Sequence, residues 1–323
     1  MIRTSLCELL GIAYPMFQGA MAWISDATLA AAVSEAGGLG IIAAGNAAAE
    51  FVREQIRIAR AKTNKPFGVN VMMMSPYAEE IARVTAAEKV PVVTTGAGNP
   101  AGYMQAWLEN GVKVIPVVPS TGIAKRMERV GAAAVIAEGG ESGGHVGDLT
   151  TMTLVPQVCG AVRIPVLAAG GIADGRGIAA AFMLGAVGVQ VGTRFLTAKE
   201  CGVHQNYKNK VLKAKDIDTM LTGKRLGHPV RSLKTPFSRT LFEKEYDSSI
   251  TNEALEKYAE GALRLAAVEG DEQNGCFLAG QAAGLVTREQ TAREILAEMF
   301  EEAERVLQTA RDSIQYDPIG SNS

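Results

Sequence analysis

The fold is decided by residues 165–195, which read PVLAAGGIADGRGIAAAFMLGAVGVQVGTRF. Two short apolar runs, Pro165–Ala169 and Gly188–Gly192, flank a glycine-rich turn and a stretch with the composition of a helix. A strand, a tight turn, a helix and a second strand in this order form a βαβ unit, in which the two strands run parallel. The segment therefore predicts a parallel sheet covered by helices.

The same alternation extends back to the N-terminus. The candidate strands share a short, β-rich apolar character and begin 20 to 32 residues apart, which leaves room for a loop and a helix between them. Several are apolar without alternation, as is typical of parallel strands that are buried on both faces. The eight strands are Tyr14–Gln18, Leu39–Ala43, Phe67–Met72, Val90–Thr95, Lys113–Val118, Ala133–Ala137, Pro165–Ala169 and Gly188–Gly192.

Helices are expected between these strands. The first is Asp26–Ala36, with Ser25 as its N-cap and Gly37-Gly38 as its stop, and a second is Ala47–Ala61. Eight strand–helix repeats predict an α/β fold, a (β/α)₈ TIM barrel. An open, doubly wound sheet with the same number of strands is the alternative.

The pattern changes after the eighth strand. Residues 199–245 hold 11 Lys and Arg against 5 Asp and Glu, an excess of +6 in a chain whose net charge is −2. Amphipathic helices are expected at about residues 252–268 and 288–310. We therefore divide the chain into a barrel (1–198 and 273–312), a smaller basic helical subdomain inserted after the eighth strand (199–272) and a flexible tail (313–323).

Composition excludes several classes of protein. At 323 residues, 47% hydrophobic and 20% charged, the chain is long enough to bury a large core. Its net charge of −2 gives no reason to expect a nucleic-acid partner. No apolar run reaches 18 residues and Glu8 interrupts the N-terminal region, so we expect a cytoplasmic protein without membrane spans. The cysteines, Cys7, Cys159, Cys201 and Cys276, are too scattered for a zinc site and suit buried thiols.

The carboxyl ends of the strands should carry the chemistry, because active sites of such barrels lie at that face. The seventh and eighth ends are AAGGIADG (Ala168–Gly175) and VGTRF (Val191–Phe195), and each precedes a helix N-terminus. Free backbone N–H groups and the helix dipole attract anions there, so we expect a phosphate site. The glycines could alternatively serve only as tight turns, and a phosphate does not distinguish a cofactor from a phosphorylated substrate.

A glycine-rich loop, GGESGGHVG (Gly139–Gly147), follows the sixth strand and contains His145. Imidazole exchanges protons near neutral pH and is the commonest acid–base group in active sites. The alternative is a surface histidine in a mobile loop. Glu138, just before the loop, could hold a ring N–H, bind a cation or pair with an Arg or Lys. The histidines lack the spacing of metal ligands, so no metal-binding residue is predicted.

At these residues the sequence resembles the FMN-dependent nitronate monooxygenase/enoyl-acyl-carrier-protein reductase II superfamily, and within it the reductase II group (FabK type). The resemblance covers about Ser5 to Ala310. It rests on QGAMAW (Gln18–Trp23), AGGLGIIAAGN (Ala36–Asn46), KPFGVNVM (Lys65–Met72), VVTTGAGNP (Val92–Pro100), VIPVVPS (Val114–Ser120), AEGGESGGHVG (Ala137–Gly147), PVLAAGGIADG (Pro165–Gly175), VQVGTRF (Val189–Phe195) and AGQAAGLV (Ala279–Val286).

The resemblance implies a flavin mononucleotide (FMN) cofactor, NADH or NADPH as reductant, and a monovalent cation, potassium or ammonium, that orders nearby loops. It implies that the flavin ring and ribityl chain contact Gly19, Ala20, Met21, Ala22, Asn46, Asn70 and Glu138. The phosphate-binding residues would be Gly170, Gly171, Gly192 and Thr193. Gln281 would lie in the segment that closes over the flavin, and His145 would be the active-site histidine. Ala20, Ala48 and Ser142 differ from the residues that are usual in the family. Because of Ser142, the shape of the loop Gly139–Gly147 could differ from that of other members.

Glu138 separates two activities within the superfamily, because nitronate monooxygenases typically have Gln there. The resemblance thus implies reduction of trans-2-enoyl thioesters on acyl carrier protein, with nitronate monooxygenase as the alternative. The basic segment would attract acidic acyl carrier protein, or it could be a solvated face without a partner. A flavin-free barrel lyase or isomerase and a non-catalytic flavin-binding protein are the remaining alternatives. A homodimer is compatible with the sequence but is not predicted by it.

Overall fold

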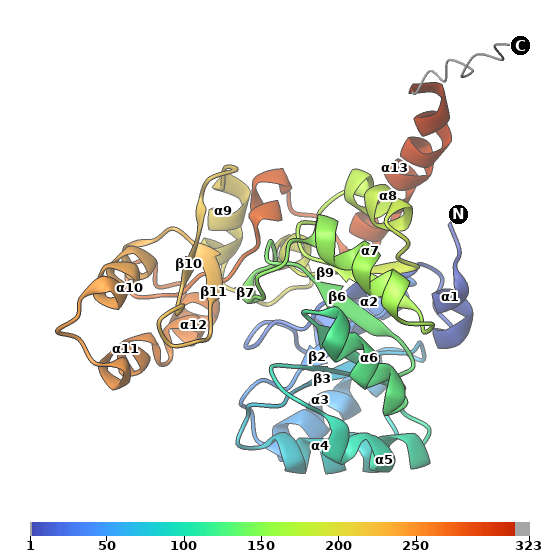
Figure 1. Cartoon of the computed structure of the whole chain (residues 1–323), viewed down its shortest axis with the longest axis horizontal. Helices are drawn as coiled ribbons and strands as arrows, with labels where there is room; N and C mark the ends of the chain where they lie inside the picture. The colour runs from blue at the N-terminus through green and yellow to red at the C-terminus, as the bar shows by residue number, and fades with distance from the viewer. Residues whose placement is uncertain (1, 314–323) are drawn as a thin grey trace, which may run out of the picture.

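Eight parallel strands form a nearly closed barrel in the computed structural model, which describes residues 2–313 (Figure 1). All eight coincide with predicted strands to within two residues at either end. This agreement confirms the (β/α)₈ TIM barrel. The barrel strands are β1 (Met16–Gln18), β2 (Ile41–Ala43), β3 (Gly68–Met72), β4 (Val92–Gly96), β5 (Lys113–Val118), β6 (Val135–Glu138), β8 (Val166–Ala169) and β9 (Gly188–Val191).

The barrel closes between its first two strands. The strands follow the order β1-β9-β8-β6-β5-β4-β3-β2. A parallel bridge between Phe17 and Leu39 joins the two ends, and the Leu39 N–H donates to Met16 O at 2.9 Å. This closure excludes the open, doubly wound sheet.

Helices cover the outside of the barrel, as expected. They are α2 (Ala27–Glu35), α3 (Ala49–Lys62), α4 (Ala78–Ala87), α5 (Ala101–Glu109), α6 (Thr121–Arg129), α7 (Thr151–Ala161), α8 (Gly175–Met183) and α13 (Ala292–Ser313). The predicted N-cap Ser25 is wrong. The Asp26 side chain caps α2 by accepting from the N–H groups of Thr28 and Leu29, because the Ser25 hydroxyl is already engaged with Gln18 and Met21.

A short helix, α1 (Ser5–Leu10), contributes to the barrel interior. Its Leu6 and Leu10 belong to the same buried cluster as Phe17, Ile41 and Leu167 of the strands. A Cβ atom at Gly188 would lie 2.5 Å from Leu6 Cδ2, so a glycine is required where α1 packs on β9. The barrel interior is therefore filled, and a ligand site is left only at the opposite, carboxyl end of the strands.

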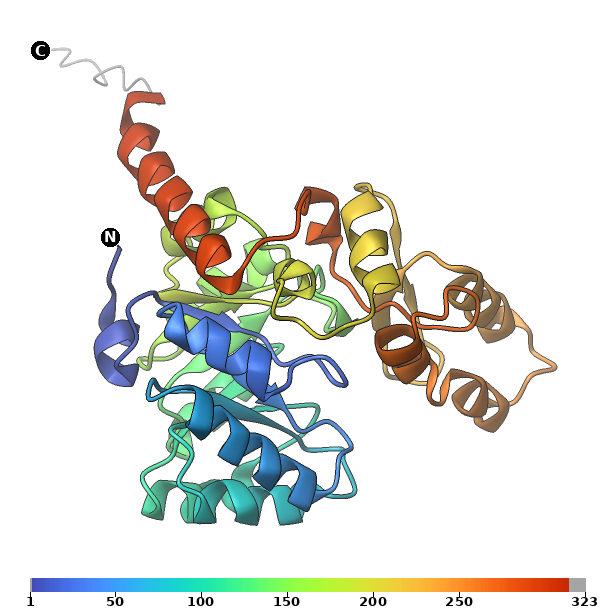
Figure 2. The same cartoon turned by 180° about the vertical axis from the view of Figure 1, so that it is seen from behind.

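The segment after β9 forms a separate lobe beside the barrel (Figures 1 and 2). Besides helices it contains a β-hairpin that the sequence analysis did not predict. Its elements are η1 (Thr193–Thr197), α9 (Gln205–Lys213), β10 (Thr219–Thr222), β11 (Val230–Leu233), α10 (Pro236–Tyr246), α11 (Asn252–Ala259), α12 (Ala262–Arg264), η2 (Leu265–Glu269) and η3 (Gln281–Leu285). A short strand from the barrel side, β7 (Gly144–His145), pairs with β11.

Both helices expected in this part differ from the prediction. The helix at 252–268 is interrupted, because Gly261 adopts a left-handed conformation (φ 73°) between α11 and α12. The final helix begins at Ala292, four residues later than expected. The predicted domain boundaries remain a prediction, and the predicted tail lies outside the described residues except for Ser313.

All four cysteines are free thiols, as predicted, with Cys7 and Cys201 buried and Cys159 and Cys276 partly buried. Among residues 2–313, no helix combines the length and the apolar character that crossing a membrane requires.

Candidate active site at the barrel mouth

Polar side chains gather at the carboxyl ends of four barrel strands. Asn70 of β3 donates from Nδ2 to Thr94 Oγ1 of β4 at 3.0 Å. Glu138 ends β6, and Gln190 of β9 lies against Gly19, where an added Cβ would be only 3.1 Å from Gln190 Cγ. These residues come from different parts of the barrel and together form the floor of a polar site.

The first turn, residues 18–23 after β1, is fixed in one conformation by hydrogen bonds of the Gln18 and Ser25 side chains. The side chain of Gln18 donates to Ser25 Oγ at 2.9 Å and accepts from the Ile41 N–H at 3.1 Å. Ser25 Oγ in turn accepts from the Met21 N–H at 3.0 Å. Ala20, Met21 and Ala22 of this turn are only partly buried, so they remain available to a ligand at the mouth.

The second turn lies beside the first. A Cβ at Gly45 would be 3.4 Å from Ala22 Cβ, which places the two turns in contact. Asn46 follows Gly45, is exposed and lines the cavity described below. The structure thus brings the predicted residues of these two turns together on one side of the mouth.

The turns after β8 and β9 carry backbone N–H groups without partners. Gly170 and Gly171 have left-handed conformations (φ 99° and 73°). Among the hydrogen bonds between the described residues, none is donated by the N–H groups of Gly171, Gly192 and Thr193. Unpaired N–H groups favour an anion, which is compatible with the phosphate site expected at these two turns.

The segment containing Gln281 closes over these turns. The Gly280 N–H donates to Thr193 Oγ1 at 2.9 Å, and the Gln281 N–H donates to Glu141 O at 2.9 Å. A Cβ at Gly280 would be 2.6 Å from Glu141 O, so this crossing requires glycine. The predicted closing segment therefore bridges the eighth barrel strand and the loop that contains His145.

The same loop is anchored at Glu141. Its carboxylate accepts from the N–H of Thr151 at 2.9 Å and lies 2.9 Å from Thr151 Oγ1, at the start of α7. On the other side, Arg231 Nε donates to Gly140 O at 3.0 Å. Ser142 donates to Gly139 O at 3.0 Å, which holds the loop in a turn at the position where the family usually has alanine. The loop is therefore tied down along its length.

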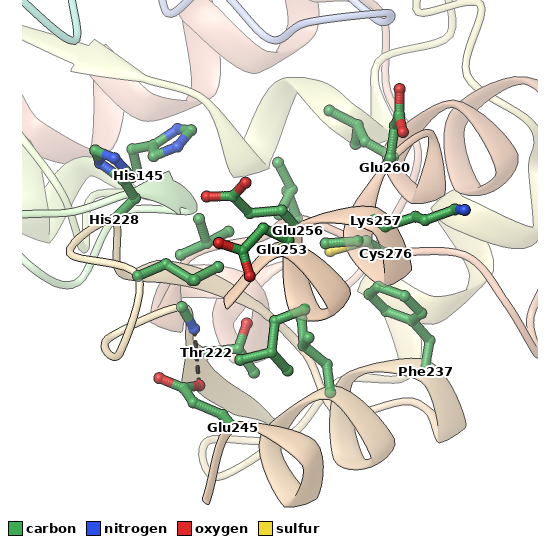
Figure 3. A pocket seen from close by; sticks show the side chains of 18 of the residues that line it. His145, Thr222, His228, Phe237, Glu245, Glu253, Glu256, Lys257, Glu260 and Cys276 are labelled. Carbon is green, nitrogen blue, oxygen red and sulfur yellow. Dashed lines mark hydrogen bonds between the residues drawn. The ribbon is translucent and has the colours of Figure 1, made fainter. Parts of the chain in front are cut away.

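His145 lies where the barrel mouth meets the inserted lobe. β7 pairs with β11 in the register Val230–His145, and the Val146 N–H donates to Pro229 O at 3.0 Å. Figure 3 shows the rings of His145 and His228 side by side at the edge of a cavity of about 820 Å³. His145 is exposed and opens onto this cavity, but the protein atoms that partly desolvate its ring and the proximity of His228 both lower its pKa from 6.5. The ring is therefore neutral at pH 7.

Comparison with known proteins decides the family. A family model described as nitronate monooxygenase matches residues 3–87 and 74–302. The chain belongs to the nitronate monooxygenase family. Membership and the structural match below indicate an oxidoreductase.

Three relatives illustrate the range of this family. The structure of FabK from Thermotoga maritima is 50% identical, with a TM-score of 0.95, and the match covers 97% of this chain and 100% of that chain. A Rhodococcus jostii protein named (3aS,4S,5R,7aS)-5-hydroxy-7a-methyl-1-oxo-octahydro-1H-indene-4-carboxyl-CoA dehydrogenase is 38% identical over 240 residues (74% of this chain, 68% of the relative). A probable nitronate monooxygenase from Staphylococcus saprophyticus is 31% identical over 354 residues (95% and 99%).

Three residues of the site escaped the sequence analysis. Gln190 was predicted only as part of the eighth strand, although alternation along β9 points its side chain toward the barrel mouth, against Gly19. Glu141 was part of the glycine-rich loop without a role. His228 stands alone in a Gly-His-Pro turn, and its position beside His145 depends on the pairing of β11 with β7, segments 85 residues apart, which no local pattern reveals.

The basic excess of the inserted lobe is smaller at the surface than the sequence suggests. Lys208 is buried and donates to Ala198 O at 2.8 Å. Lys210 pairs with Glu272 at 2.8 Å, and Arg231 is partly buried against the His145 loop. These three basic groups are therefore less available at the surface to attract an acidic partner. Acyl carrier protein accordingly remains a proposal.

Glu138 has an unusual proton affinity. Burial raises its pKa from 4.5 to about 7, and the proximity of the Ser142 hydroxyl partly opposes this rise. Between pH 4.5 and about pH 7, Glu138 keeps its proton in the folded chain and loses it in the unfolded chain. The free energy of unfolding therefore falls as the pH rises from 4.5 to about 7.

The substitution Glu138→Gln removes this titration. In protein freed of flavin, it is expected to raise the free energy of unfolding by about 1–3 kcal/mol at about pH 8 relative to wild type, and far less at about pH 4.5. Urea unfolding at the two pH values measures the difference. An equal effect at both values would show that the Glu138 carboxyl titrates normally.

Proposed function

We propose that this chain reduces trans-2-enoyl thioesters carried on acyl carrier protein, with NADH or NADPH as reductant and FMN as cofactor. This reaction is the last step of the fatty-acid elongation cycle. The observation that carries the proposal is the match to FabK, at 50% identity and a TM-score of 0.95 over nearly the whole of both chains. The Rhodococcus relative, named as acting on a carboxyl-CoA, supports a thioester substrate class.

The residues at the barrel mouth fit FMN. The unpaired N–H groups of Gly171, Gly192 and Thr193 suit its phosphate. A Cβ at Gly192 would meet only Met21 Sδ, at 4.0 Å, so this side of the mouth offers open space between the phosphate turns and the first turn. We propose that Met21, Asn70 and the other ring and ribityl residues named above contact the cofactor in that space. The chemistry that FMN supplies when bound is hydride transfer from the nicotinamide to the β-carbon of the enoyl thioester.

The chain itself positions the thioester. Because His145 is neutral at pH 7, it can donate one N–H hydrogen bond to the thioester carbonyl oxygen, where negative charge develops during reduction. Its position between the barrel mouth and the 820 Å³ cavity suits this role, since a substrate there lies between the cofactor residues and the lobe. We therefore favour His145 as the group that holds the carbonyl over His145 as an imidazolium acid.

Nitronate oxidation is the second candidate, favoured by the family model and by the Staphylococcus relative. Two assays distinguish the candidates. Crotonyl-acyl carrier protein with NADH should be reduced at least roughly 10-fold more efficiently, in kcat/KM, than a nitronate is oxidised. NADPH replaces NADH in a parallel assay.

Oxidation of the nitronate without reduction of the thioester would reject the reductase in favour of the monooxygenase. Bound flavin without either activity would indicate a non-catalytic flavin protein, and a colourless protein active on a phosphorylated compound would indicate a lyase. The monovalent cation stays a prediction.

A further inference from the structure

The cavity beside His145 extends away from the barrel into the inserted lobe. One end is lined by His145 and Asn46, which belong to the barrel mouth. The other end reaches Phe237 of α10 (Figure 3), and Leu241 of α10 and Leu255 of α11 also line the cavity. At about 820 Å³, the cavity has the size of a small-molecule site rather than of a packing defect.

The walls are predominantly apolar. Phe237, Leu241 and Leu255 belong to a hydrophobic cluster of the lobe that is separate from the clusters of the barrel, and all three are at most 7% exposed. The remaining apolar lining is Leu226, Val230, Ala259, Leu263, Cys276 and Leu278. A lobe of this size would ordinarily close such a space by packing its side chains together, so the open cavity points to an apolar ligand.

One wall of the cavity is held in place by hydrogen bonds of the buried Glu245 and of Arg225. The carboxylate of Glu245, itself 6% exposed, accepts from the N–H groups of Gly223 at 2.9 Å and Arg225 at 2.6 Å. Arg225 also donates to Asp247 O at 3.0 Å, which ties the same turn to the end of α10. This turn carries Leu226 and His228, so its wall is formed before any ligand enters.

The charged residues on the rim restrict what can enter. Glu253, Glu256 and Glu260, in α11 and at its C-cap, line the cavity and are exposed, and Lys257 lines it as well. An anionic group, such as the phosphate of a carrier arm, would be repelled along this side. A neutral, apolar chain meets no such barrier, because its carbons contact the leucines below the rim.

We propose that this cavity holds the acyl chain of the thioester substrate, with the reacting double bond near His145 and the chain running toward Phe237, Leu241 and Leu255. The inference rests on the proposed function and deepens it, since it gives the lobe the role of selecting long, uncharged acyl chains. Each methylene group that enters the cavity is expected to improve kcat/KM by up to about 4-fold, until the cavity is filled.

The test uses coenzyme A thioesters of trans-2-butenoate and trans-2-dodecenoate with the FMN-loaded enzyme. The wild type should favour the longer substrate. Ala259→Trp places an indole in the cavity and should lower kcat/KM for the dodecenoyl substrate by at least about 10-fold, while the butenoyl substrate changes less than about 3-fold. Ala254→Trp is the matched control, because Ala254 lies on the same helix, is exposed and does not line the cavity.

Retained butenoyl reduction shows that a variant is folded. If Ala259→Trp fails to fold, Leu226→Trp blocks the opposite wall and carries the same expectation. Equal effects on both substrates, no effect on either, or the same change in Ala254→Trp would each overturn the placement of the acyl chain and leave the reductase proposal intact. A wild type that reduces neither thioester would remove both proposals.

Discussion

Replacing His145 with alanine is expected to lower kcat/KM for enoyl reduction by about 10²–10⁴-fold, while the protein keeps its flavin. His145 lies on β7, at the edge of the cavity, and contacts the lobe through the pairing of β7 with β11. Its loss would remove the only imidazole on the barrel side of the mouth. Steady-state assays with crotonyl-acyl carrier protein, beside a flavin spectrum, measure both effects.

The pH profile of the wild type distinguishes the two roles of His145. The immediate surroundings of the ring and His228 lower its pKa, so the ring is neutral on the alkaline side of that value and still carries one N–H donor. A hydrogen-bond donor should therefore keep its activity as the pH rises through the His145 pKa. An imidazolium acid would instead lose activity as the pH rises through its pKa.

His204→Ala is the matched control for this substitution. His204 caps α9 by accepting from the Asn206 N–H at 3.1 Å and does not line the cavity, so its removal costs about 1 kcal/mol of stability and little activity. Near-normal turnover in His145→Ala, or an equal loss in His204→Ala, would remove His145 from the mechanism.

Substituting Gly192 with valine is expected to abolish tight FMN binding without unfolding the protein. Gly192 has a negative φ (−108°), and an added Cβ would meet only Met21 Sδ at 4.0 Å, so the folded chain tolerates a side chain there. The valine methyl groups would instead occupy the space between the unpaired N–H groups and the first turn. We expect the affinity for FMN to fall at least about 10²-fold, equivalent to about 2.7 kcal/mol.

Gly202→Val supplies the control, because Gly202 is exposed and has no atom within 4 Å of its added Cβ. Flavin fluorescence titrations of the two apo variants compare their affinities. Circular dichroism reports whether each is folded. Wild-type affinity in Gly192→Val would place the phosphate elsewhere.

The barrel was predictable because its signals are local. Each strand is a short apolar run with a polar or glycine-rich end, and each turn carries residues suited to backbone contact, so eight repeats identify the fold. The end of α2 was also predictable from a local signal, because Gly37 takes the left-handed conformation (φ 100°) that ends a helix. The N-cap of α2 was misplaced by one residue, because Ser25 and Asp26 are both good caps and only the contact of Ser25 with Gln18 decides between them.

The inserted lobe was less predictable because its structure depends on distant contacts. β10 and β11 carry mixed residues, TMLT and VRSL, that indicate no strand, and Gly144-His145 forms one only by pairing with Val230 and Arg231. The position of His228, and with it the cavity, follows from that pairing. The break at Gly261, in contrast, was visible as a glycine within an amphipathic pattern.

The central claim is that the turns after β8 and β9 hold the phosphate of FMN while the glycine-lined mouth holds its ring. Titration of the apo protein with FMN, followed by flavin fluorescence and absorbance, tests it most directly. The account predicts saturation at one FMN per chain, competed by inorganic phosphate. Failure of the folded wild-type protein to take up FMN would contradict it.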